Sequence, residues 1–145
     1  MKITIVASIQ FTKEMLALRD ELERMGHTTF LPYTAKQIEA GELSLEEFMK
    51  EKNAHGDLRF RTMGPDRIKR YYNKIISSDA ILVANYSKNN IQNYIGGNAL
   101  MEIGFAYVND KKIFLLNDIP EMPYTDEIKA MNPVLLKGNL SGIPI

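Results

Sequence analysis

Short apolar runs alternate with amphipathic stretches along the chain, and this alternation predicts a repeated strand and helix order. The apolar runs are rich in β-branched residues, as is typical of buried strands. They cover residues 2–6, 80–84, 113–116 and 134–136, and a further strand is predicted over residues 27–31, stopped by Pro32. Residues 80–84 are apolar at every position, which indicates a central parallel strand covered on both faces.

The stretches between these runs repeat apolar residues at helical spacing. Residues 15–25 predict a first helix, with Thr12 as its N-cap and Gly26 at its end. Two further helices are expected to begin at Ser44, in a capping-box pattern, and at Asp66. Later helices are expected over the apolar stretch 99–108 and, more briefly, near residues 126–131.

Five strands alternating with helices predict an α/β fold, namely a doubly wound three-layer sandwich around a five-stranded parallel sheet. The expected strand order is the flavodoxin-like order 2-1-3-4-5. We expect residues 1–145 to form a single domain, with 33–65 as its least regular part.

Composition excludes several kinds of function. Lys plus Arg and Asp plus Glu both number 18, so no global field favours a nucleic acid polymer or an anionic membrane as partner. The chain has no cysteine, which excludes disulfides and thiolate chemistry, and its two histidines lie far apart, which disfavours a metal site. Without a signal-like or membrane-spanning stretch, the expectation is a soluble cytoplasmic protein with a small-molecule substrate.

Glu102 is the one charged residue in the apolar stretch 99–108. Burying an unpaired carboxylate is costly, so such a group must find partners or shift its pKa. A wet edge of the helix, or an arginine partner elsewhere, would explain it structurally. A role in chemistry is the alternative.

The predicted topology indicates where that chemistry would lie. In open parallel sheets, ligands bind beyond the carboxyl ends of the strands, at the switch between strands one and three. The loops there bring together a group of candidate binding residues around Glu102: Ser8, Asn85, Gly96, Gly97 and Asn98. The Gly-Gly pair lets backbone N–H groups approach an anion or a sugar, although such pairs also mark ordinary turns.

Three segments, 77–84, 93–106 and 111–116, resemble the nucleoside 2-deoxyribosyltransferase superfamily, which includes the 2′-deoxynucleoside 5′-phosphate N-hydrolases. The shared pattern is an Asp heading the central strand, here Asp79, then a Gly-containing loop and a Glu-Ile-Gly-x-Ala helix that begins at Glu102. Ala7-Ser8-Ile9 is similar to the family's sugar and phosphate loop. The Gly-Gly-x-x-x-x-Glu element is also similar to that of cytokinin-activating phosphoribohydrolases.

The resemblance implies an enzyme of the N-glycosidic bond that needs no cofactor. Glu102 would attack the anomeric carbon, Asp79 would position or protonate the leaving base, and Ser8 and Ile9 would bind the sugar or phosphate. Asp79 at a strand start can equally cap a turn. The loop 85–98 contains no acidic residue to read a base, so the base and the choice between transfer and hydrolysis stay open.

Two further expectations concern partners and ligands. The resemblance and the apolar helices predict a homo-oligomer, formed through the Glu102 helix or the Tyr71-Tyr72 helix. The two tyrosines are expected to lie in the core or in the oligomer interface. The basic run 56–70 is either solvated surface or the source of an arginine for a 5′-phosphate. A catalytically silent nucleotide-binding or sensory module is the alternative to an enzyme.

Overall fold

A five-stranded parallel sheet organises the protein, with the strand order β2-β1-β3-β4-β5. The computed structural model describes residues 1–55 and 58–145. Their side chains are described as well, except those of residues 55–66. The strands are β1 (Lys2–Val6), β2 (Thr28–Phe30), β3 (Ala80–Val83), β4 (Lys112–Leu115) and β5 (Val134–Leu135). This all-parallel α/β arrangement confirms the predicted fold class and the flavodoxin-like strand order.

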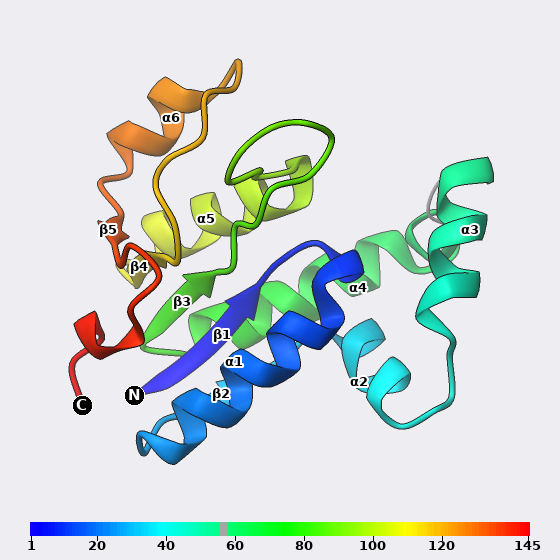
Figure 1. The fold of residues 1–145 in the computed structure, drawn as a ribbon, viewed down its shortest axis with the longest axis horizontal. Coiled ribbons are helices and arrows are strands. Elements are labelled where there is room, and N and C mark those ends of the chain that lie inside the picture. Colours follow the sequence, from blue (N-terminus) through cyan, green and yellow to red (C-terminus); the bar gives the residue numbers. More distant parts are fainter. Residues whose placement is uncertain (56–57) are drawn as a thin grey trace.

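Helices cover both faces of the sheet, as Figure 1 shows, with α1 in front and α4 and α5 behind. They are α1 (Thr12–Arg24), α2 (Tyr33–Glu39), α3 (Leu45–His55), α4 (Leu58–Ile76), α5 (Gly97–Val108) and α6 (Thr125–Ala130). Short 3-10 turns cover Ile9–Phe11 and Leu140–Gly142.

The central strand β3 is buried on both faces. Ala80 and Leu82 belong to the hydrophobic cluster that includes the inner side of α1, whereas Ile81 and Val83 belong to the cluster formed with α4 and α5. Successive side chains of a strand point to opposite faces, so a fully apolar strand supplies both cores at once. The three-layer arrangement follows directly from this pattern.

Two of the predicted helix boundaries are correct and two are wrong. Gly26, at a φ of +96°, follows the last turn of α1, and the Glu47 amide donates to the Ser44 hydroxyl at the start of α3 (3.3 Å). Thr12 does not cap α1. It is the first residue of the helix, and its hydroxyl donates to the Ile9 carbonyl (2.6 Å), because a 3-10 turn leads directly into α1.

Helix α4 begins at Leu58, eight residues before the predicted start at Asp66. Pro65 therefore lies within the helix instead of preceding it. A proline removes one backbone hydrogen bond, and tertiary packing of an amphipathic helix can outweigh that cost. Helix α4 packs against α3, α5 and β1.

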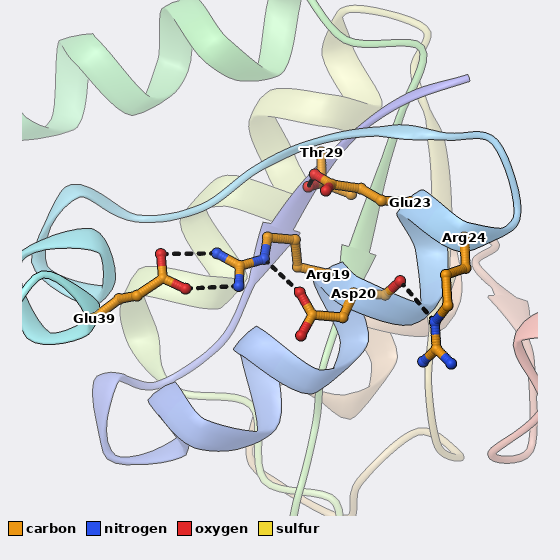
Figure 2. A network of polar contacts seen from close by, with 6 residues as sticks. All are labelled: Arg19, Asp20, Glu23, Arg24, Thr29 and Glu39. Carbon is orange, nitrogen blue, oxygen red and sulfur yellow. Dashed lines mark hydrogen bonds and ion pairs between the residues drawn. The ribbon is translucent and has the colours of Figure 1, made fainter.

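An ion-pair network fastens α2, an element absent from the sequence prediction, to α1 (Figure 2). The Arg19 guanidinium on α1 donates to both carboxylate oxygens of Glu39 on α2, at 2.8 and 2.6 Å, and also to Asp20 at 2.9 Å. The Arg19 guanidinium lowers the pKa of the Glu39 carboxyl. A two-pronged contact of this kind sets the orientation of a helix as well as its position.

Within the described residues, the helices are all too short or too polar to cross a lipid bilayer.

Candidate functional site

A cavity of about 610 Å³ opens beyond the carboxyl ends of β1 and β2. Its walls come from the loop after β1, the start of α2, the last turns of α4, the loop after β3 and the first turns of α5. This is the switch between β1 and β3, where ligands of open parallel sheets bind. Its volume suits a nucleotide-sized ligand.

Six of the eight residues predicted to form the site line this cavity. They are Ser8, Ile9, Gly96, Gly97, Asn98 and Glu102. The topology explains this grouping, because parallel strands deliver the loops that follow them to the same edge of the sheet. Asp79 and Asn85 are the two that do not line it.

Asp79 lies at the amino ends of the strands, opposite the end at which the cavity opens. It precedes β3, and its carboxylate accepts a hydrogen bond from the backbone N–H of Lys2 (2.8 Å), the first residue of β1. The side chain thus joins the amino ends of two adjacent strands. The expected role in protonating a leaving base does not fit this position, and the printed contact joins two strands instead of capping a neighbouring turn.

Asn85 is buried, with its side-chain polar atoms occupied by hydrogen bonds. Its amide nitrogen donates to the backbone carbonyls of Asn93 (3.4 Å), Asn117 (3.2 Å) and Asp118 (3.0 Å). Its side-chain oxygen accepts from the Asn117 N–H (2.9 Å). Asn85 therefore holds together the loops after β3 and β4, and the predicted contact with substrate is replaced by a structural role.

Glu102 reaches the cavity from the second turn of α5 and is partly buried. Burial raises the pKa of its carboxyl to about 8, although the positive charge of Arg67 acts in the opposite direction. Loss of water around a carboxylate disfavours the charged form, which explains the direction. The apolar surroundings of Glu102 predicted a carboxyl that must find a partner or shift its pKa, and its pKa in the structure is raised.

Tyr71 on α4 lines the same part of the cavity as Glu102. Its hydroxyl donates to the backbone carbonyl of Ile5 in β1. Burial, together with the nearby Glu102 carboxylate, raises the pKa of the Tyr71 hydroxyl well above 10. The neighbouring Tyr72 packs edge-on against Phe105, with ring centroids 5.1 Å apart. Tyr72 therefore contributes to packing, whereas Tyr71 belongs to the wall of the cavity.

The first turn of α5 brings backbone to the surface of the cavity. At Gly96 an added Cβ would lie 3.1 Å from the Tyr94 ring, a tight contact that requires the ring to shift. At Gly97 an added Cβ would meet no protein atom within 4 Å. Packing does not require glycine at position 97. Its missing side chain leaves room for a ligand to approach the backbone N–H groups of the helix start.

The asparagine-rich loop between β3 and α5 has a defined shape (Figure 1, green). Asn89 and Asn90 both have positive φ, and Lys88 and Ile91 exchange backbone hydrogen bonds of 3.1 and 2.9 Å, which is the pattern of a type I′ turn. Asparagine tolerates this backbone conformation, so these two asparagines serve the turn. The turn thereby fixes the backbone of the adjoining residues Lys88 and Ile91.

Lys88 is the functional candidate in this loop that sequence reasoning missed. Its ammonium donates to the Ser8 hydroxyl (2.9 Å) and lies 5.5 Å from the centroid of the Tyr94 ring. Burial, and secondarily Lys52, lowers the pKa of the Lys88 ammonium. The available signal was a single lysine among asparagines in a loop next to the predicted site. A lysine in a polar loop more often lies in solvent, so this signal was weak.

Positive side chains dominate the described lining of the cavity. They are Lys52, Arg67, Arg70, Lys74 and Lys88, and Glu102 is the one acidic residue among the described lining residues. Arg70 and Lys74 also contact the rings of Tyr33 and Phe30 (5.8 and 5.0 Å). Of the predicted basic run, Arg59 and Arg61 fall outside the residues whose side chains are described. Arg67 and Arg70 do reach the cavity.

The described residues contain no group of three His, Asp or Glu side chains arranged to hold a metal ion. Comparison of the chain with models of protein families, with curated proteins and with solved structures found no significant match.

Proposed function

We propose that the protein is an enzyme that cleaves or transfers the N-glycosidic bond of a nucleoside, a deoxynucleoside or a corresponding 5′-monophosphate, with Glu102 as nucleophile. The observation that carries this proposal is the position of Glu102, a partly buried carboxylate facing a nucleotide-sized cavity beside the Ser8 loop. The resemblance of the segments around Asp79, Gly96 and Glu102 to the nucleoside 2-deoxyribosyltransferase superfamily supports the same reaction class.

In the proposed reaction, the Glu102 carboxylate attacks the anomeric carbon and forms a glycosyl ester. The bond from that carbon to the base nitrogen breaks, and its electron pair leaves with the base, which takes up a proton. Water or a second base then attacks the same carbon and releases Glu102. Carboxylates stabilise the positive charge that develops at the anomeric carbon in such reactions.

The surroundings of Glu102 impose a condition on this mechanism. A nucleophile must be ionised, and with a pKa of about 8 most of the Glu102 carboxyl is protonated at pH 7. Among the described lining residues Glu102 is the one carboxyl group, so no second carboxylic acid there protonates the base. We expect kcat/KM to rise with pH up to about pH 8. A fall over that range would assign Glu102 the role of general acid.

Replacement of Glu102 by Gln tests the proposal directly. The amide keeps the shape of the side chain and removes the charge, so turnover should fall by a factor of about a thousand or more, while ground-state binding persists. Release of free base from a panel of nucleosides and 5′-monophosphates, with and without an acceptor base, is the measurement. Glu127→Gln, on the exposed side of α6, is the matched control. Cleavage by Glu102→Gln at the rate of the unmodified protein would rule out the nucleophile.

Gly97 offers a second test at the same site. Because a Cβ at this position meets no protein atom, Gly97→Ala should leave stability unchanged or raise it slightly. The added methyl group should nevertheless weaken ligand binding by obstructing the approach to the start of α5. Unchanged binding of a nucleotide would show that the ligand does not approach this turn.

A catalytically silent nucleotide-binding module is the second candidate. The observation in its favour is the single carboxylate in the described lining, since Asp79 lies at the amino ends of the strands. Binding without cleavage across the whole substrate panel would establish this function in place of the enzyme.

Self-association belongs to the same proposal. Tyr107 and Val108, at the end of α5, are 51% and 73% exposed, which is consistent with an interface formed by the Glu102 helix. A stable interface should bury more than about 1,000 Å². Sedimentation of a monomer at micromolar concentration would reject it.

A further inference from the structure

The charge of the cavity differs from that of the whole chain. The chain is neutral, with 18 basic and 18 acidic residues, yet the described lining carries five basic side chains and one acidic one. In the described part of the chain, neither Lys52 nor Lys88 forms an ion pair. A concave site with an excess of one charge attracts ligands of the opposite charge. A neutral nucleoside would leave the positive charges of Lys52 and Lys88 without a counter-charge.

Lys88 and Ser8 form a preorganised pair of hydrogen-bond donors. The ammonium uses one of its three N–H groups on the Ser8 hydroxyl oxygen (2.9 Å), which leaves two. Since that oxygen is the acceptor, the serine keeps its own O–H to donate. Both side chains line the cavity. Three donors at one point suit a group with several acceptor oxygens.

The backbone around Lys88 keeps this pair in place without a ligand. The type I′ turn at Asn89 and Asn90 fixes the loop locally, and Asn85 fixes its base against the loop after β4. Lys52, on α3, is close enough for its positive charge to act on Lys88. An anion between the two would remove their repulsion and replace the water that Lys88 has lost.

We propose that the substrate carries a phosphomonoester, as a nucleoside 5′-phosphate does, and that Lys88 is the residue that binds the phosphate and selects against the free nucleoside. The proposal rests on the proposed function for the identity of the remaining substrate, the sugar and base. Phosphate offers three acceptor oxygens and a charge near −2, which match the donors and the positive excess.

Sugar phosphates test this selectivity independently of the base. Calorimetric titrations would compare 2-deoxyribose 5-phosphate with 2-deoxyribose, and ribose 5-phosphate with ribose. We expect the phosphorylated sugar to bind the unmodified protein at least about tenfold more tightly, and to lose affinity as ionic strength rises. Equal affinities, or no measurable binding of either phosphorylated sugar, would overturn the proposal.

Variants assign the effect to Lys88. Lys88→Met keeps the length of the side chain and removes its charge, and it should weaken binding of the sugar phosphate by roughly 10- to 100-fold, the range for a charge-assisted hydrogen bond. Lys88→Arg keeps the charge and should retain most of the affinity. Lys129→Met, on the exposed side of α6, controls for loss of a lysine charge elsewhere. Full affinity in Lys88→Met would overturn the assignment.

A second position guards against failure of Lys88→Met to fold. Lys52→Met should weaken the sugar phosphate several-fold and leave the unphosphorylated sugar unaffected, and an unchanged ratio would count against the proposal.

The two proposals fail in different ways. Binding of a sugar phosphate without cleavage of any nucleotide would reject the enzyme and retain the phosphate site. Equal kcat/KM for nucleosides and their 5′-phosphates would retain the enzyme and reject the phosphate site.

Discussion

The partly buried carboxyl of Glu102 should make the folded protein less stable as the pH rises. In the unfolded chain this group titrates near its ordinary value of 4.5, whereas burial raises its pKa to about 8 in the folded protein. The folded state therefore holds a proton that the unfolded state releases between these values. The contribution of this proton to the free energy of unfolding is fully present below about pH 4.5. It is lost progressively as the pH approaches 8, where the loss levels off.

The size of the effect follows from the difference between the two pKa values. At about 1.4 kcal/mol for each pH unit, the total loss is at most about 5 kcal/mol. Since Glu102 is only partly buried, this figure is an upper limit. About half of it, roughly 2.5 kcal/mol, should develop between pH 5 and pH 7, and about 1.4 kcal/mol more by pH 9.

Glu102→Gln isolates this contribution, because the amide does not titrate. Urea unfolding of both proteins at pH 5, 7 and 9 gives the difference in their free energies of unfolding, in which groups common to both cancel. The variant should gain stability relative to the unmodified protein as the pH rises, and Glu127→Gln should reveal how much comes from exchanging a surface carboxylate. A difference that stays constant within about 0.5 kcal/mol from pH 5 to pH 9 would refute the reasoning from burial.

The remaining predictions concern structural side chains around the site. Asp79→Asn should leave turnover unchanged, because Asp79 lies at the amino ends of the strands; a large loss in kcat would contradict this placement. Asn85→Ala should lower the free energy of unfolding by about 2–4 kcal/mol, since it leaves several buried backbone groups without partners, and a change below 0.5 kcal/mol in urea titrations would exclude the clamp. Arg19→Met should lower the free energy of unfolding by about 1 kcal/mol at pH 7 and leave it unchanged near pH 2. The reason is that Arg19 lowers the pKa of Glu39, and their ion pair is lost once that carboxyl is protonated. Urea unfolding curves at both pH values would show whether the difference disappears.

The sequence was sufficient for the sheet, for a clear reason. A wholly apolar strand such as residues 80–84 needs a sheet that is covered on both faces, and the alternation of strands with helices favours a parallel sheet with few topologies. Helix ends were harder to predict. The 3-10 turn before Thr12 and the continuation of α4 across Pro65 both depend on packing against distant elements, which local pattern does not contain.

The site was predictable as far as topology determines it. Ser8 and the first turns of α5 had to meet, because both follow carboxyl ends of neighbouring strands. Asp79 and Asn85 were misassigned because a polar residue at a strand end looks the same in sequence whether it binds a ligand or the backbone. The hydrogen bonds of the folded chain separate the two cases. Lys88 was missed because its direction depends on the turn at residues 89 and 90.

The contact between Ser8 and Lys88 joins residues that are 80 positions apart in the chain. No local segment can form it, so the binding pocket exists only when the chain has completed its most distant pairings, β1 with β3. Any ligand of the pocket consequently binds the native state alone and adds its binding energy to the stability of the whole sheet, about 2.7 kcal/mol at a hundred times Kd. The melting temperature should therefore rise when a substrate binds, even where no reaction follows.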